Sequence, residues 1–376
     1  MHVLLISAGY PTSYNLKKSI FHQSQAEALA ANGCRVGVVA VVPISIKEIY
    51  QKRSIKLGWI RSKYKKVEAA VYQYISIPKL KKQWLNMPLK KGKKEVIEYI
   101  ERNGVPDFVH LHSFQAGYLA LWVKQQYGVK VVVTEHSSRF YHNTWSQSML
   151  KHARFVFENC DFRIAVSPLF SDRLNVVFNL SFSYLPNCVD TDFFKPFVQS
   201  ETDQFMFVCV ASFNKNKNQQ LLVNAFEKTF LPSEKVSLVF CGQGENKASV
   251  ERLVKEKERN HQVDFVGDVD RIALRSLLNK SKVLLSSSKV ETFGITLIEA
   301  MSMGVPVLST KSGGPQTIIT QDYLGFLVDG ASMGDKMREI YSSYASYDPI
   351  KIRAYAVENY SSKNLAKKLV DIYQSL

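Results

Sequence analysis

Apolar segments of strand length alternate with amphipathic segments of helix length along almost the whole chain. In the first half, "HVLLIS" at 2–7 and "RVGVVAVV" at 35–42 are expected strands, separated by an expected helix near 21–32. The pattern restarts at Phe205 and continues to about Thr310. Such alternation is typical of βαβ units built on parallel sheets. The sequence therefore predicts an α/β fold with two doubly wound domains in tandem.

The length of 376 residues also suits two domains, since a domain usually has roughly 100 to 200 residues. Turn and aromatic residues interrupt the pattern at 184–204. The last segment, "SSKNLAKKLVDIYQSL", carries apolar residues at helical spacing and predicts an amphipathic closing helix. We predict a first domain over 1–186, a second domain over 187–358 and a closing helix at 359–376.

The composition excludes several classes of protein. Hydrophobic residues make up 46% and charged residues 22%, which is typical of a globular chain. The 5 cysteines form no CxxC pair, which argues against a disulfide framework or a zinc site and favours a reducing cytoplasm. No apolar run approaches the roughly 18 residues of a membrane span, and the N-terminus is typical of a buried strand instead of a signal peptide.

Most of the net charge of +16 lies in one segment, residues 47–94, which we call the basic segment. It holds 15 Lys or Arg against two acids, with aromatic residues such as Trp59 and Tyr72 between the cations. Cations interleaved with aromatics suit an anionic membrane surface. A solvated, flexible insertion and a nucleic-acid-binding patch are the alternatives, and no nucleic-acid-binding motif accompanies the segment.

Two carboxylates, Glu291 and Glu299, stand eight positions apart around Gly294, in "SSSKVETFGITLIEAMSMGVPVLSTKSGGP". A helix that opens at a glycine turn after a strand offers free backbone N–H groups to an anion such as phosphate. Because Glu299 lies on the helix and Glu291 precedes it, a glycosidase-like carboxylate pair is not implied. The alternatives are two separate ligand contacts or ordinary surface charge.

This region resembles the E-x7-E motif of the family 4 (group 1) retaining glycosyltransferases, with Ser288 three residues before Glu291. Other stretches resemble that family in the same order, among them "HLHSFQAG", "TEHSS", "LPNCVDTDFFKP", "CGQGE" and "DFVGDV". The resemblance covers nearly the whole chain. It implies the GT-B fold, in which two Rossmann-like domains face each other across a cleft and the C-terminal helix crosses back to the first domain.

The resemblance also implies roles for residues of the second domain. Glu299 would bind the ribose of a nucleotide-sugar donor, Glu291 the hydroxyls of the transferred sugar, and Lys217 the donor diphosphate. The donor-binding set is completed by Phe293, Gly294 and Ile295, by Gly242, and by Ser212 and Lys215. Ser212 stands where family members commonly carry an arginine, and Lys215 is the candidate replacement. The glycine-rich turn that often follows the first strand is also missing.

In the first domain, His136 matches the family histidine that contacts the donor sugar. His110 and His112 alternate along a strand and share one face, but they supply too few ligands for a metal site. We therefore expect no metal, and no cofactor beyond the donor itself. Structural roles are predicted for these two histidines.

By this resemblance the protein is a retaining hexosyltransferase of bacterial surface polysaccharide or lipopolysaccharide synthesis. Its acceptor is expected to be a glycan, lipid-linked through polyprenyl diphosphate, and its location the inner face of the cell membrane. A sugar-nucleotide epimerase of the same fold is the alternative enzyme, and a nucleic-acid-binding protein is the alternative of a different class.

Overall fold

The computed structural model describes residues 1–376 except 13–14, 16–17, 52–54, 77–80 and 199–203. The chain divides into two compact units. Unit 1 comprises Met1–Cys188 together with Ser362–Leu376, and unit 2 comprises Val189–Ser361. The predicted boundaries at 186 and 358 stand two and three residues away from these divisions.

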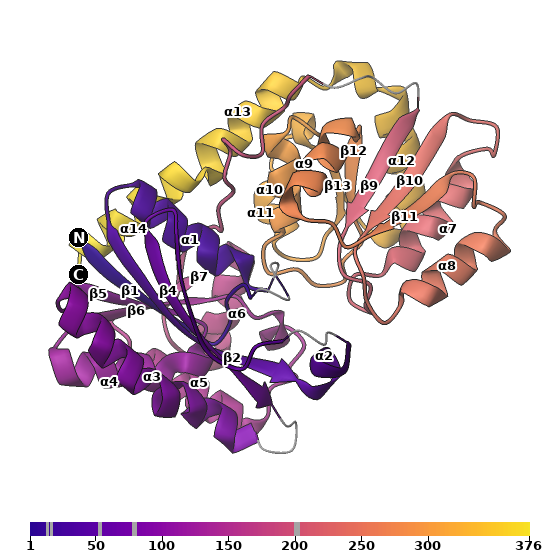
Figure 1. The fold of residues 1–376 in the computed structure, drawn as a ribbon. Helices are drawn as coiled ribbons and strands as arrows, with labels where there is room; N and C mark the ends of the chain where they lie inside the picture. Colours follow the sequence, from indigo (N-terminus) through magenta and orange to yellow (C-terminus); the bar gives the residue numbers. More distant parts are fainter. Residues whose placement is uncertain (13–14, 16–17, 52–54, 77–80, 199–203) are drawn as a thin grey trace. The chain divides into compact units, whose positions relative to one another are not determined.

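Unit 1 is built on an eight-stranded sheet with the order β3-β4-β2-β1-β5-β6-β7-β8. All neighbouring strands pair in parallel except β3, which pairs antiparallel to β4 at the edge (Figure 1). The strands are β1 (His2–Ser7), β2 (Arg35–Ser45), β3 (Gly58–Tyr64), β4 (Val67–Ser76), β5 (Phe108–His112), β6 (Lys130–Glu135), β7 (Phe162–Ala165) and β8 (Ser183–Tyr184).

Helices cover both faces of this sheet, as expected for parallel strands that are buried on both sides. The helices are α1 (Ile20–Ala31), α2 (Ile46–Gln51), α3 (Lys81–Asn103), α4 (Gly117–Tyr127), α5 (Gln147–Asn159), α6 (Pro168–Phe178) and the closing helix α14 (Ser362–Gln374). The apolar stripe of α14 packs into the same core as α1 and β1, through Leu365, Leu369 and Tyr373 (Figure 1). The predicted closing helix therefore completes unit 1.

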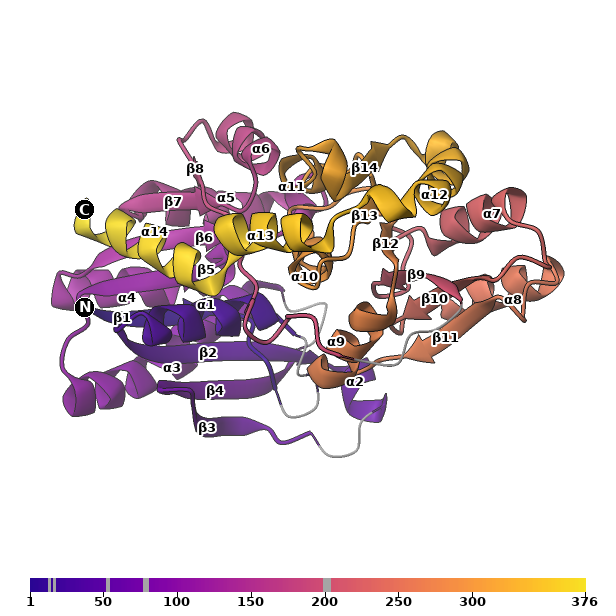
Figure 2. The ribbon, with the colours of Figure 1, turned by 90° about the horizontal axis from the view of Figure 1, so that it is seen from above.

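Where the structure describes it, the basic segment forms secondary structure, which argues against the alternative of a flexible insertion for those residues. It contributes the hairpin of β3 and β4 and the start of α3, and Figure 2 shows β3 at the edge of the sheet. The reason is the alternation of Val67, Ala69 and Val71, whose side chains are buried on one face of β4. Lys52, Arg53 and Lys79 lie outside the described residues.

Unit 2 has a six-stranded, fully parallel sheet with the order β11-β10-β9-β12-β13-β14. Numbered within the unit, this order is 3-2-1-4-5-6, that of the Rossmann fold. The strands are β9 (Phe205–Val210), β10 (Val236–Cys241), β11 (Val263–Gly267), β12 (Val283–Ser286), β13 (Val307–Thr310) and β14 (Gly325–Val328). The helices are α7 (Gln219–Thr229), α8 (Lys247–Glu256), α9 (Arg271–Lys280), α10 (Ile295–Ser302), α11 (Pro315–Ile318), α12 (Met333–Ser342) and α13 (Pro349–Tyr360).

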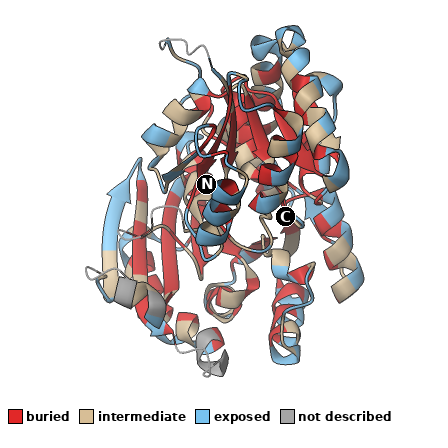
Figure 3. Cartoon of the chain, turned by 90° about the vertical axis from the view of Figure 1, so that its right-hand side faces the viewer, coloured by how far each residue is buried: buried red, intermediate tan, exposed pale blue. Residues whose placement is uncertain are grey.

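Each unit has its own core, visible in Figure 3 as buried strands beneath helices whose outer faces are exposed. Aromatic rings dominate the core of unit 2, where Phe207, Phe226 and Phe230 are at most 2% exposed. The 5 cysteines are free and buried. Within the described residues, no helix combines the length and the apolar character that a membrane crossing requires.

Candidate functional site

The strand order of unit 2 changes direction between β9 and β12, and this switch point places the loops that follow the two strands side by side. Ligands of doubly wound sheets bind at such points, beyond the carboxyl ends of the strands. The loop after β9 is residues 211–218, and the loop after β12 is residues 287–294. Lys217 lies in the first loop and Glu291 in the second.

Asn216 holds the two loops together. Its side-chain amide donates to the carbonyl of Val290 at 2.8 Å and its side-chain oxygen accepts from the backbone N–H of Val290 at 3.2 Å. Its own carbonyl accepts from the backbone N–H of Lys289 at 2.8 Å. The sequence analysis missed Asn216, which lies in the polar run "NKNKN" where no spacing distinguishes a clamp from a solvated side chain.

The clamp brings Lys217 and Glu291 into a direct ion pair between Nζ and Oε2. The two side chains are only 24% and 21% exposed, so the pair is shielded from water on most sides. Glu291 is itself fixed, because its N–H donates to Ser312 at 2.7 Å and its carbonyl accepts from Gly314 at 2.7 Å. A cation and a carboxylate are thus held at the switch point of a nucleotide-binding type of sheet.

Helix α10 opens directly after this loop. Gly294 precedes it with φ 111°, a left-handed conformation that glycine adopts without steric cost. No side chain caps the helix, and no acidic residue lies in its first turn. The Leu297 N–H donates to the carbonyl of Gly294 at 3.0 Å, and the N–H groups of Ile295 and Thr296 before it have no acceptor one turn earlier in the helix, which suits an anion.

The other predicted residues of unit 2 surround this point. Ser212 and Lys215 are exposed in the loop after β9, and the hydroxyl of Ser212 accepts from the Asn214 amide at 3.0 Å. Glu299 lies one turn into α10 and is partly exposed. The Phe293 ring is 1% exposed and packs on Tyr360, so only the Phe293 backbone is left to face a ligand.

Gly242, which follows β10, has a packing reason of its own. A Cβ atom there would lie 2.1 Å from the carbonyl oxygen of Ala211, so the close approach of two loops requires glycine. Its placement in the donor-binding set stays a prediction.

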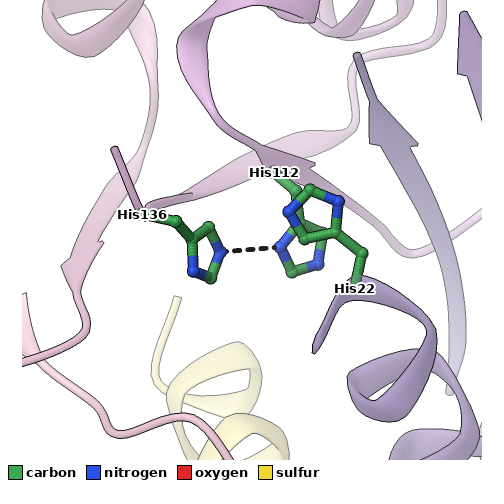
Figure 4. A group of neighbouring side chains, drawn as sticks. All are labelled: His22, His112 and His136. Carbon is green, nitrogen blue, oxygen red and sulfur yellow. Dashed lines mark hydrogen bonds between the residues drawn. The ribbon is translucent and has the colours of Figure 1, made fainter. Parts of the chain in front are cut away.

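In unit 1, a histidine cluster of His22, His112 and His136 forms at the carboxyl ends of β1, β5 and β6 (Figure 4). His112 Nδ1 and His136 Nε2 share a hydrogen bond of 3.2 Å, and the His22 ring lies 4.3 Å from the His112 ring. The sequence analysis missed His22, because 90 residues separate it from His112 and only the parallel topology brings them together.

Burial keeps these rings neutral. Desolvation lowers the pKa of His22 to about 4, and desolvation followed by the neighbouring histidines lowers the pKa values of His112 and His136 well below the usual value. His22 Nδ1 lies 2.7 Å from the carbonyl oxygen of Gly9, so it carries the proton and leaves Nε2 as a lone pair. His136 Nδ1 is buried without a partner.

The hydrogen bond within this cluster argues against a metal. One nitrogen from each ring lies within 4.8 Å of the others. The bond between His112 and His136 occupies a lone pair that a metal would need. Both ring nitrogens of His110 form hydrogen bonds outside the cluster, with the Tyr373 hydroxyl at 2.5 Å and the Thr134 hydroxyl at 2.8 Å.

Glu135, at the end of β6, fixes the backbone next to the cluster. Its carboxylate is fully buried and accepts from the backbone N–H groups of His136 and Ser137 at 2.9 Å. It also accepts from Phe114 at 3.2 Å and from the Ser113 hydroxyl at 3.3 Å. One buried side chain thus ties together the loops that follow β5 and β6.

Two Rossmann-like units, with a cation, a carboxylate and a helix start at the switch point of the second, are the architecture of GT-B proteins. Comparison with known proteins agrees. The family described as "Glycosyl transferases group 1" matches residues 190–369, and that described as "Glycosyltransferase Family 4" matches residues 23–193. The chain belongs to the family 4 (group 1) glycosyltransferases.

Among its relatives is one subunit of the phosphatidylinositol N-acetylglucosaminyltransferase of Arabidopsis thaliana. The two are 27% identical over 261 residues, which cover 68% of this chain and 58% of that protein. The alignment thus spans little more than half of the relative's length. Sucrose-phosphate synthase from Thermosynechococcus elongatus shares the fold with a TM-score of 0.78 at 20% identity, covering 100% and 98% of the two chains. Anabaena HepE, in complex with UDP and glucose, shares it with a TM-score of 0.73 at 14% identity, covering 100% of both.

Proposed function

We propose that this chain is a retaining glycosyltransferase that moves a hexose from a nucleotide-diphosphate donor to a glycan acceptor. The observation that carries the proposal is the Lys217–Glu291 ion pair beside the uncapped start of α10. A donor needs a cation for its diphosphate, an acceptor of hydrogen bonds for its sugar hydroxyls, and free N–H groups for its phosphate oxygens. This one corner of unit 2 supplies all three.

In the proposed reaction the acceptor hydroxyl attacks the anomeric carbon on the face from which the diphosphate departs. The bond between that carbon and the phosphate oxygen breaks, and the departing oxygen takes the acceptor's proton. Negative charge grows on the diphosphate, where Lys217 and the N–H groups of α10 stabilise it. Glu291 binds the hydroxyls of the transferred sugar, Glu299 the ribose, and His136 the sugar from unit 1.

The ion pair also keeps both charges satisfied before a donor binds. Lys217 and Glu291 pair with each other while both are largely shielded from water, which avoids two unpaired charges. When a donor arrives, its diphosphate competes for Lys217 and its sugar hydroxyls donate to Glu291. Both charges are already present and already shielded from water before the donor binds. The binding energy of the donor is therefore used to orient it.

The acceptor is proposed to be lipid-linked and to serve bacterial surface polysaccharide or lipopolysaccharide synthesis at the inner face of the membrane. The basic segment supports a peripheral membrane role, since each cation near an anionic surface contributes on the order of 1 kcal/mol. The relative from Arabidopsis thaliana carries a lipid, phosphatidylinositol, in its name.

A thermal-shift screen against UDP-, GDP- and ADP-sugars tests the proposal, because a ligand that binds only the native state raises the melting temperature. We expect one nucleotide class to stabilise the protein, and NMR of the product to show a retained anomeric configuration. An inverted product would reject the retaining mechanism. Conversion of a donor without any acceptor would point to an epimerase, and salt-sensitive oligonucleotide binding without donor turnover to a nucleic-acid-binding protein.

A further inference from the structure

Unit 1 contains a cavity that we call the edge pocket. It has a volume of about 260 Å³ and lies between α1, the loop after β1 and the hairpin of β3 and β4. A single buried water needs only about 10–15 Å³, so the pocket has room for a ligand fragment. Its walls are Tyr10, Pro11, Thr12, Gln23, Glu27, Ile60, Ser62, Tyr64, Val67, Ala69, Val71 and Gln73.

The floor of the edge pocket is apolar. Val67, Ala69 and Val71 alternate along β4 and point to one face, and the cross-strand partners of Ala69 and Val71 are Ser62 and Ile60. This face lies at the edge of the sheet. A hydrocarbon surface of this kind favours an apolar ligand, since burial of each methylene contributes about 0.8 kcal/mol.

The two ends of the edge pocket differ. At the hairpin turn, Lys65 pairs with Glu27 of α1 at 3.3 Å, and Gln23 donates to Glu27 at 2.7 Å, which closes that side. At the carboxyl ends of the strands, Thr12 Oγ1 and Gln73 Oε1 are buried without a hydrogen-bond partner. An unpaired buried polar group costs about 1–3 kcal/mol, so these two atoms mark the polar end of a ligand site.

The loop after β1 that carries Thr12 also carries a cation, Lys18. Lys18 Nζ donates to the carbonyl of Pro43 at 2.8 Å. Pro43 pairs in register with Tyr74, the neighbour of Gln73 in β4. Desolvation lowers the pKa of Lys18, and an anion would offset that desolvation. The ammonium has three N–H donors, one of which the Pro43 bond uses.

We propose that the edge pocket binds the hydrocarbon chain next to the phosphate of a lipid-linked acceptor, with the phosphate at Lys18. The apolar floor matches the chain, and the Thr12 hydroxyl can donate to an oxygen of the group where chain and phosphate join. The inference rests on the proposed function, because it gives the acceptor of that reaction its chemical class. The glycan would then lie at the carboxyl edge of the sheet, where the histidine cluster lies.

Calorimetric titration with dodecyl phosphate below its micelle concentration tests this pocket, with butyl phosphate and dodecyl maltoside as comparison ligands. We expect the wild-type protein to bind dodecyl phosphate at least about tenfold more tightly than butyl phosphate. Lys18→Gln should weaken dodecyl phosphate about tenfold and leave dodecyl maltoside unchanged. Equal affinities for the two chain lengths would overturn the proposal.

Filling the pocket gives a second test. Ser62 is exposed on the edge strand, so Ser62→Trp should fold and lay its ring over Ala69. We expect it to weaken dodecyl phosphate at least about tenfold, and Ala69→Leu to act in the same direction. The matched control is Val266→Trp, on the exposed edge strand β11 of unit 2, which should stay within about twofold of wild type. Equal losses in the two tryptophan variants would refute a specific pocket.

Two further measurements separate this inference from neighbouring ideas. Donor binding is measured in the same variants by thermal shift. If the protein binds a nucleotide sugar but not dodecyl phosphate, the edge-pocket proposal is wrong and the proposed function is unaffected. If it binds dodecyl phosphate but no nucleotide sugar, the proposed function alone is wrong. If Ser62→Trp abolished binding to phosphatidylglycerol vesicles as fully as binding to dodecyl phosphate, the occupant would be a bilayer lipid, and the acceptor assignment would be wrong.

Discussion

At the scale of single residues, the contact that organises unit 2 is the ion pair between Lys217 and Glu291. Exposed ion pairs contribute little to stability, typically below about 1 kcal/mol, and a shielded pair must repay its desolvation. The presence of such a pair at a strand switch point is better explained by a ligand than by stability. Its loss should therefore change turnover more than folding.

Replacing either member of the pair tests this expectation. Lys217→Met removes the cation that stabilises the leaving diphosphate, and Glu291→Gln removes the charge that holds the sugar. We expect each to lower kcat/KM by about 100-fold or more, with a melting temperature close to that of wild type. The control is Lys289→Met, because Lys289 is exposed on the same loop. Wild-type rates in Lys217→Met would show that the pair is only structural.

Metal removal tests the histidine cluster. Because the hydrogen bond between His112 and His136 occupies a nitrogen lone pair that a zinc ion would need, dialysis against EDTA should leave transfer unchanged. Metal analysis of the purified protein supplies the control. If EDTA abolished activity, Zn²⁺ restored it in the wild-type protein and Zn²⁺ failed to restore it in His22→Gln, the cluster would be a metal centre.

The sequence can predict that two residues lie close together where a motif is specific, and it cannot do so where only the topology makes the contact. The sequence predicts both Lys217 and Glu291 as site residues, and the structure brings them together. It does not predict Asn216 or His22, because an asparagine in a polar run and a histidine on a short helix carry no signal of their own. Their partners lie 74 and 90 residues away in sequence.

At the scale of secondary-structure elements, a strong apolar periodicity is sufficient to predict a helix. A high density of charged residues, in contrast, can hide a strand. The spacing of Leu365, Leu369 and Tyr373 predicts the closing helix, and the structure has α14 there. The hairpin of β3 and β4 escapes prediction because the cations of β3 and of the turn before β4 draw attention to charge, although β4 itself contains no lysine or arginine. The extended conformation follows from burial of one face, which a charge count does not reveal.

The loop before α10 depends on one close approach. A Cβ atom at Gly314 would lie 2.3 Å from the backbone of Phe293, so Gly314→Ala must displace one of the two segments. We expect a stability loss of about 1–3 kcal/mol in urea unfolding, together with weaker donor binding, since Phe293 leads into the helix start. Gly330→Ala is the matched control, because its Cβ would meet only the Leu221 side chain at 3.3 Å. Equal behaviour of the two variants would contradict the argument.

At the scale of the whole molecule, each unit has its own sheet, but unit 1 takes its last helix from the end of the chain. The C-terminal residues therefore belong to the stability of the first unit. The buried histidines also lie mostly in unit 1, on α1, β5 and α5 and after β6. The acid stability of the protein should consequently be decided there.

The sign of that pH dependence follows from the lowered pKa values. Desolvation lowers the pKa of His110 to about 3 and those of His22 and His152 to about 4, and the pKa values of His112 and His136 lie well below the usual value. The unfolded chain binds protons at these sites below about pH 6.5, whereas the folded protein does not until each lower pKa is reached. Stability is therefore present above about pH 6.5 and is lost as the pH falls from about 6.5 towards 4.

Each histidine contributes up to about 1.4 kcal/mol per pH unit within that window. Glu135 acts in the opposite direction, because desolvation raises its pKa, but it is one group against six histidines, since desolvation also lowers the pKa of His2. Urea unfolding at pH 7.5, 6.5, 5.5 and 4.5 should show a steep decline below 6.5. His152→Gln should reduce the slope of stability against pH by the contribution of about one proton, because one titrating group is removed. Glutamine is chosen because it keeps a donor for the Phe114 carbonyl that His152 contacts at 3.1 Å. A curve that stays level from pH 7.5 to 5.5 would mean that these rings are hydrated and protonate freely in the folded protein.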